Sequence, residues 1–245
     1  MSKSPADGKE TRRVAIIQSA YVPWRGFFDL INRCDEYVVF DSVQFAKRHW
    51  HNRNVLKTAQ GPSWITIPVA SKSRFEQPID AVEISEPWAE KHWKSIEANY
   101  RKAHCFSSVA PVLQRLYEAC SRENLLTNVN EILLRGLLEI LDIDTRIVRD
   151  SAYEPTGTRT DRLLDICVKA QATHYLSGPS ARSYLEEDKF REAGITVEWM
   201  DYPDYPIYRQ LWGDFTPAVS IIDLLLNEGP ARPDLWSGAL LGEGA

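Results

Sequence analysis

Paired cysteines, long apolar runs and an excess of positive charge are all missing from this 245-residue chain. The four cysteines form no C-x-x-C pair, so we expect neither a metal cluster nor a disulfide framework, but reduced thiols in a cytoplasmic protein. No apolar run approaches the roughly 18 residues of a membrane-spanning helix, so no membrane insertion is expected. With 29 Lys and Arg against 34 Asp and Glu, the net charge of −5 disfavours a nucleic-acid partner.

The short motifs of several large enzyme classes are also absent. The chain contains no G-x-G-x-x-G, no G-x-x-x-x-G-K-[ST] and no G-x-S-x-G. These absences disfavour dinucleotide oxidoreductases, Walker-type ATPases and the usual α/β-hydrolases. No H-E-x-x-H or comparable ligand spacing occurs, so no metal site is predicted.

Short β-branched runs alternate with helical segments along most of the chain. We expect strands at 14–17, 37–40, 64–69, 81–84, 145–148, 173–177 and 195–199. Helices are expected at 27–33, in three pieces over 88–141, at 160–171, after Ser180 and at 219–227, with Pro111 in the first turn of the second middle piece. This alternation predicts an α/β fold with a mostly parallel sheet, helices on both faces and a helical middle segment.

The domain organisation expected from composition is simple. Residues 1–13 are polar and charged, which predicts a disordered leader. Residues 14–230 are expected to form one domain, because 44% hydrophobic residues suffice for one sizeable core. The Ala-, Gly- and Pro-rich stretch 231–245 is expected to be a weakly structured tail.

Open parallel sheets bind ligands at the carboxyl ends of their strands, so residues that follow strands are the candidates for a binding site. Three segments qualify: the loop after the first strand, the run opened by Asp41, and the turn after 173–177. The predicted substrate-binding residues are Gln18, Tyr21, Trp24, Gln44, Lys47, Arg48, Trp50, Arg53, Asn54, Ser177, Gly178, Ser180 and Arg182.

The most informative of these segments is 47–57, which holds four Lys or Arg, two His, one Trp and two Asn. The arginine fork suits phosphate or carboxylate, and an aromatic face suits a base or sugar ring. The composition indicates a pocket for a nucleotide-linked or phosphopantetheine-linked substrate, with no resident cofactor assigned. The alternative is a loop whose charges simply face water.

The turn at Ser177-Gly178-Pro179-Ser180 places small residues where a helix is expected to begin. Backbone N–H groups at such a position can hold a phosphate or an oxyanion. The alternative is an ordinary strand-to-helix turn in which Ser180 is the N-cap.

Three side chains are candidates for catalytic proton transfer: His92, His174 and Asp41. His92 lies between Trp88 and Trp93, so it is either a general base or a packed residue whose pKa is lowered by burial. His174 begins a predicted strand and belongs either to the core or to the crevice. Asp41 ends the second predicted strand.

Five stretches of the chain resemble the WbqC-like family: 14–31, 35–57, 64–69, 160–184 and 198–213. The most specific are Q-S-x-Y-x-P-W-x-G-F-F-D-L-I and K-R-x-W-x-N-R-N. Ser42 stands where a second acidic residue is common, and His49 and His51 stand where Asp and Arg are more usual. The resemblance implies a role in making or decorating sugars of bacterial surface polysaccharides such as O-antigen, or in related secondary-metabolite biosynthesis.

Three functions remain open at this point. The first is acyl or aminoacyl transfer from a carrier-protein thioester to an amino sugar or other amine, with Lys47, Arg48 and Arg53 holding phosphate, His92 or His174 as base, and the backbone near Ser177 and Gly178 steadying the oxyanion. The second is a nucleotidyltransferase-like enzyme, because the first strand, the Pro-Trp-Arg-Gly turn and the next helix resemble the opening of cytidylyltransferase-like folds. The third is a non-catalytic partner of a biosynthetic complex.

Overall fold

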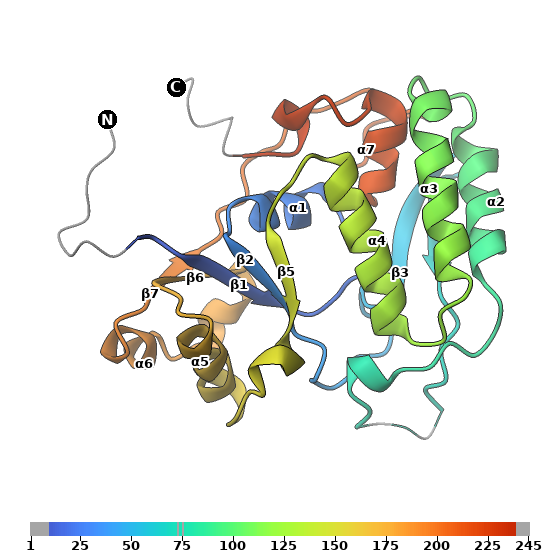
Figure 1. The fold of residues 1–245 in the computed structure, drawn as a ribbon. Helices are drawn as coiled ribbons and strands as arrows, with labels where there is room; N and C mark the ends of the chain where they lie inside the picture. The colour runs from blue at the N-terminus through green and yellow to red at the C-terminus, as the bar shows by residue number, and fades with distance from the viewer. Residues whose placement is uncertain (1–9, 73, 75, 239–245) are drawn as a thin grey trace.

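A five-stranded parallel sheet forms the centre of the fold (Figure 1). The computed structural model describes residues 10–238 except 73 and 75. Its strands are β1 (Arg13–Ile17), β2 (Glu36–Val39), β5 (Arg146–Arg149), β6 (His174–Ser177) and β7 (Thr196–Trp199), in the order β5-β2-β1-β6-β7. The predicted α/β class with a mostly parallel sheet is confirmed.

Helices cover both faces of this sheet (Figure 1). On one face lie α1 (Arg25–Asn32), α4 (Leu126–Ile140) and α7 (Ile221–Glu228), with α3 (Phe106–Cys120) and α2 (Ala89–Tyr100) packed beyond α4. On the other lie α5 (Arg159–Lys169) and α6 (Glu187–Glu192). Successive side chains of β1 alternate between these layers: Ala15 belongs to the larger core, whereas Val14 and Ile16 belong to the smaller one.

An antiparallel hairpin of β3 (Arg53–Thr58) and β4 (Gly61–Thr66) packs against α2 and α7. The sequence predicted no strand at 53–58, because two inward positions carry polar side chains. Asn54 donates to the carbonyls of Tyr21 and Val22, both at 2.9 Å, and Lys57 Nζ donates to Gln210 Oε1 at 2.7 Å. These bonds satisfy groups that would otherwise be costly to bury.

Three local predictions were wrong. Residues 81–84 form no strand; Val69 and Ile84, and Glu83 and Leu125, make only isolated bridges. Pro111 lies inside α3, because that helix already begins at Phe106. After Gly178 the chain forms a 3-10 helix, Pro179–Ser183, before α6 begins at Glu187. Further 3-10 turns occupy Ile79–Ala81, Asp150–Tyr153 and Pro233–Leu235.

The chain ends extend the fold slightly beyond the expected boundaries. Residues 1–9 of the expected leader and 239–245 of the expected tail lie outside the described residues. β1 begins at Arg13, and Arg12 Nη2 donates to the buried carboxylate of Glu36 at 2.9 Å. Leu235 and Trp236 are buried in the larger core, so this part of the expected tail belongs to the packed domain.

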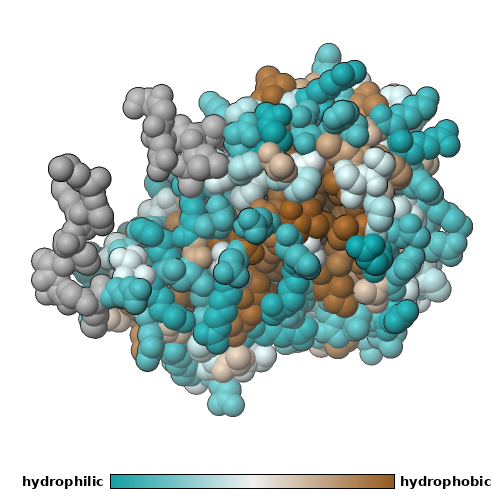
Figure 2. Space-filling model, turned by 45° about the horizontal axis from the view of Figure 1, so that its top comes forward, coloured by the Kyte–Doolittle hydropathy of each residue, from teal (hydrophilic) through white to brown (hydrophobic). Residues whose placement is uncertain are grey.

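The surface drawn in Figure 2 is mainly hydrophilic, with hydrophobic residues showing as a band across its middle. Within the described ranges, no helix has the length and apolar character that crossing a bilayer requires.

Candidate active site

A cleft of about 1310 Å³ opens at the carboxyl ends of the central strands. The chain builds the sheet from β1 toward β2 and β5 on one side, and later adds β6 and β7 on the other. The topological switch point therefore lies between β1 and β6. The connections that follow β1 and β6 run in opposite directions and leave a crevice between them. In open α/β sheets this crevice is the usual position of a ligand.

The three segments that the sequence singled out all border this cleft. Seven of the predicted substrate-binding residues line it: Gln18, Trp24, Trp50, Asn54, Ser177, Gly178 and Ser180. Apolar side chains, among them Ile16, Phe27 and Phe40, share the lining. The combination of an apolar wall with a few polar groups is typical of small-molecule sites.

One wall of the cleft carries two histidines, His49 and His51. His51 is only 2% exposed, and its Nδ1 lies 3.0 Å from the carbonyl oxygen of Ser19. A carbonyl only accepts, so Nδ1 carries the proton and Nε2 keeps its lone pair. Burial lowers the pKa of His51 below 6.5, and burial followed by the charge of Arg53 lowers that of His49. Both imidazoles are thus neutral near pH 7, with ring centroids 4.6 Å apart.

Asp41 supports this wall from behind and is not among the described residues that line the cleft. Its Oδ1 accepts from the Ser19 N–H at 2.8 Å, and its Oδ2 accepts from Thr127 Oγ1 at 2.6 Å. Asn130 Nδ2 donates to Ser19 Oγ and to the His51 carbonyl, both at 2.9 Å. Because the Ser19 carbonyl orients the His51 ring, this buried network fixes the imidazole in the cleft.

A second wall carries Arg159 and Arg162 from the start of α5. Arg162 Nη2 donates to Ser42 Oγ at 2.8 Å, and that hydroxyl in turn donates to Asp150. Sequence reasoning missed both arginines. The available signal was their position: they open a helix that follows β5, so they too lie at the carboxyl edge of the sheet.

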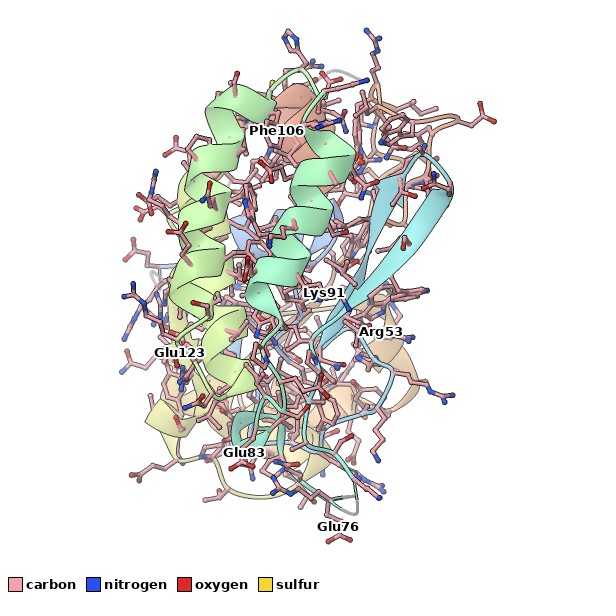
Figure 3. The ribbon with its side chains drawn as sticks, turned by 90° about the vertical axis from the view of Figure 1, so that its right-hand side faces the viewer. Arg53, Glu76, Glu83, Lys91, Phe106 and Glu123 are labelled. Atoms are coloured by element: carbon pink, nitrogen blue, oxygen red, sulfur yellow. The ribbon has the colours of Figure 1, made fainter. Side chains whose placement is uncertain are left out.

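Four cations and one glutamine that the sequence favoured lie outside the cleft lining. The described residues that line the cleft do not include Lys47, Arg48, Arg53, Arg182 or Gln44. Arg53 is stacked over the Trp64 ring at 4.1 Å, and Trp50 is 5.3 Å from Trp64, so these side chains form an aromatic and cationic surface at the base of the hairpin. Figure 3 shows Arg53 at the end of the hairpin away from its turn.

The other four of these side chains also lie outside the lining. Lys47 and Arg48 are exposed, and Gln44 forms an isolated bridge with Pro78. Arg182 is stacked over Trp199 at 5.2 Å. The segment 47–57 therefore turns its neutral side chains, not its cations, toward the cleft.

His92 and Tyr21 lie in a buried hydrogen-bonded cluster. Tyr21 Oη is 2.8 Å from both His92 Nδ1 and Tyr117 Oη, and Trp88 packs 5.0 Å from the imidazole. Burial lowers the pKa of His92 to about 4, partly opposed by a hydrogen bond to the Thr66 backbone. This arrangement is the one expected of a packed histidine, and neither residue is part of the cleft lining as described.

His174 is the first residue of β6, at the amino edge of the sheet. Its Nδ1 lies 2.9 Å from Thr173 Oγ1, and its Nε2 lies 3.9 Å from Glu198 Oε1. Ser177 ends the same strand at the cleft, about 10 Å away at the rise of an extended chain. His174 therefore lies on the opposite edge of the sheet from the cleft.

An aromatic loop after β7 forms the rim of the cleft. Trp24 packs against Tyr202 at 5.1 Å, and a β-carbon on Gly26 would lie 2.4 Å from the Trp24 ring, so only glycine allows this close approach. Buried Arg25 holds the loop by donating to the carbonyls of Pro206 and Leu235, both at 2.8 Å. Across the described ranges, no three His, Cys, Asp or Glu side chains gather in a way that could hold a metal ion.

The chain is similar to known proteins along most of its length. The model of the WbqC-like protein family matches residues 18–234. The uncharacterized protein Rv1507c of Mycobacterium tuberculosis is 47% identical over 224 residues, which cover 91% of this chain and 96% of that protein. No solved structure matches the chain.

Proposed function

The chain belongs to the WbqC-like protein family, and on that premise we propose that it is a transferase acting on an activated biosynthetic intermediate in the cleft at the switch point. The favoured reaction is acyl or aminoacyl transfer from a carrier-protein thioester to an amine such as an amino sugar, in polysaccharide or related secondary-metabolite biosynthesis. The observation that carries the proposal is His51, a neutral imidazole with a fixed tautomer at a large cleft.

His51 suits the proton transfer that this reaction requires. As the amine nitrogen attacks the thioester carbonyl, a C–N bond forms and Nε2 accepts the amine proton. Collapse of the tetrahedral intermediate breaks the C–S bond, and the proton passes from Nε2 to the departing thiolate. Ser177 and Ser180 line the cleft, and their hydroxyls are the proposed donors for the oxyanion.

The size of the cleft supports a two-substrate reaction. A volume of about 1310 Å³ exceeds the roughly 300–1,000 Å³ of a single small-molecule site. The apolar lining suits a thioester arm, and the polar groups at the ends of β1 and β6 suit a sugar. Excluding water from such a cleft would protect the thioester from hydrolysis.

Nucleotidyl transfer is the second candidate, favoured by the strand order. The switch point between β1 and β6 is where mononucleotides and dinucleotides bind in doubly wound sheets. The two candidates differ in their leaving group, which is a thiol in acyl transfer and pyrophosphate in nucleotidyl transfer. The exposed rings of Trp50 and Trp64, with the half-buried Arg53 stacked on Trp64, favour contact with a partner protein, which acyl transfer from a carrier protein would also require.

A mass-spectrometric transfer assay tests the proposal. Purified protein is incubated with charged carrier proteins and a panel of amino sugars to detect amide products, and in a parallel assay with nucleoside triphosphates and sugar phosphates to detect released pyrophosphate. We expect an amide product, with His51→Gln lowering the rate by about 10²- to 10⁴-fold, the usual range for a general base. The control His104→Gln replaces an exposed histidine and should retain the full rate.

Release of pyrophosphate from a nucleoside triphosphate without amide formation would move the assignment to nucleotidyl transfer. If no group is transferred in either assay, the chain is a partner protein and the transferase proposal is wrong.

A further inference from the structure

The two arginines at the start of α5 stand out because they carry charge into the cleft without a counter-ion. Among the described residues, neither Arg159 nor Arg162 forms an ion pair. Glu186 also lines the cleft, but it is 3.2 Å from Lys189 Nζ. In a chain of net charge −5, two uncompensated arginines in one cleft need an explanation.

Arg162 is held in place by contacts that leave part of its donor fork unused. Nη2 donates to Ser42 Oγ, which is anchored on Asp150, and the guanidinium lies 6.0 Å from the Phe40 ring. Its Nε is buried and has no hydrogen-bond partner among the described residues. A buried donor without a partner is costly, and a ligand anion that accepts from it removes that cost.

Arg159 contributes a second, more exposed guanidinium. Its backbone φ is +50°, a left-handed conformation that is uncommon for residues other than glycine and often marks functional positions. α5 has 11 residues, and its positive dipole end adds to the potential of both arginines.

We propose that Arg159 and Arg162 form an anion subsite that binds the phosphodiester or pyrophosphate group of the substrate. This inference rests on the proposed function only in taking the cleft as the substrate site. The arginine fork matches two phosphate oxygens at once. The subsite lies on the α5 side of the cleft, whereas His51 comes from the loop before β3. With its phosphate bound at the subsite, the substrate would extend across the cleft and place its reactive end near His51.

Isothermal titration calorimetry tests this subsite with three probes: inorganic pyrophosphate, 4′-phosphopantetheine and a nucleoside diphosphate sugar. The wild type is expected to bind at least one of them, and the preferred probe separates a pantetheine-linked from a nucleotide-linked source of phosphate. Arg162→Gln is expected to weaken binding by about 10- to 100-fold, and Arg162→Lys by less, because it keeps the charge but not the fork. Ser42→Ala should weaken binding a few-fold by releasing Arg162.

Arg182→Gln is the matched control, since Arg182 also follows a strand of the central sheet but is stacked on Trp199 outside the cleft lining. It should leave the affinity unchanged. Should Arg162→Gln fail to fold, Arg159→Asn replaces an exposed side chain and serves in its place, with an expected loss of about 10-fold. The proposal is overturned if no probe binds, if both cleft variants keep wild-type affinity, or if Arg182→Gln loses as much.

The binding experiment is independent of catalysis. Arg162-dependent binding without any group transfer would support the subsite and contradict the transferase. Transfer that proceeds at the wild-type rate in Arg162→Gln, together with unchanged anion binding, would contradict the subsite alone.

Discussion

The side chains of the segment 47–57 that point into the fold differ in burial and charge from those that point toward solvent; we call the two sets the inner and the outer side. Its inner side chains His51 and Asn54 are buried, neutral and hydrogen-bonded to the backbone of the loop after β1. On its outer side Lys47 and Arg48 are exposed, and the half-buried Arg53 is stacked on Trp64. The net charge of a segment therefore does not determine which of its side chains reach a ligand. The register and burial of each residue determine this.

The largest expected effect concerns the support of the inner side. Asp41→Ala removes a buried carboxylate that accepts two hydrogen bonds and leaves the Ser19 N–H and the Thr127 hydroxyl without partners. Each unsatisfied buried group costs about 1–3 kcal/mol, so the free energy of unfolding in urea should fall by about 4 kcal/mol.

Asp35→Ala is the matched control for Asp41. Asp35 also accepts a backbone hydrogen bond, from Arg13 N at 2.6 Å, but it is exposed. Its replacement should cost less than about 1 kcal/mol. Equal losses in the two variants would mean that Asp41 does not support the inner side as described.

Acid should destabilise the protein through its buried histidines. The pKa of His92 is about 4 in the folded protein against 6.5 for the ordinary group, so between these values the unfolded chain binds a proton that the folded protein does not. Stability is therefore lost as the pH falls below 6.5, by about 3 kcal/mol at pH 4. His51 and His49 shift in the same direction.

Urea titrations between pH 7.5 and 4 measure this loss. In His92→Gln the decline of stability with falling pH should be shallower than in the wild type, because one of the protons is no longer taken up on unfolding. His104→Gln, at an exposed position, controls for the removal of a histidine. Parallel curves for the wild type and His92→Gln would show that His92 is not the buried, neutral group described above.

The smallest expected effect lies on the outer side. Arg53→Ala removes a half-buried guanidinium stacked at 4.1 Å over the exposed Trp64 ring, an interaction that is worth about 1 kcal/mol. Thermal unfolding should shift by only a few degrees, and the affinity for small ligands of the cleft should be unchanged. Loss of small-ligand binding in this variant would erase the distinction between the two sides.

Much of the fold was predictable because β-branched runs such as Val14-Ala15-Ile16-Ile17 are typical of buried parallel strands. The convergence of three loops at one edge followed from the direction of parallel strands. β3 was missed because Asn54 and Lys57 occupy inward positions where a pattern reading expects apolar residues. Only the three-dimensional partners of these groups show that they can be buried.

The catalytic candidates were harder to place for two physical reasons. His174 begins its strand, and in a parallel sheet that end lies away from the cleft, a consequence the sequence already contained. The burial of His92 depends on Tyr21, which lies 71 positions before it in the chain and is itself 96 positions from its other partner, Tyr117. The position of Arg162 after β5 places it at the carboxyl edge of the sheet, but its approach to the cleft between β1 and β6 depends on the order of the strands, which no local pattern reveals.

The central claim is that substrate binds in the cleft beside His51, and two-dimensional NMR of ¹⁵N-labelled histidine side chains tests it most directly. Spectra of the free protein, assigned with His51→Gln, should show His51 as the Nδ1–H tautomer with a pKa below 6.5. Adding the ligand found by calorimetry should shift the His51 and His49 signals and leave those of His92 and His174 in place. A ligand that shifts His92 or His174 while His51 stays unchanged would contradict the account.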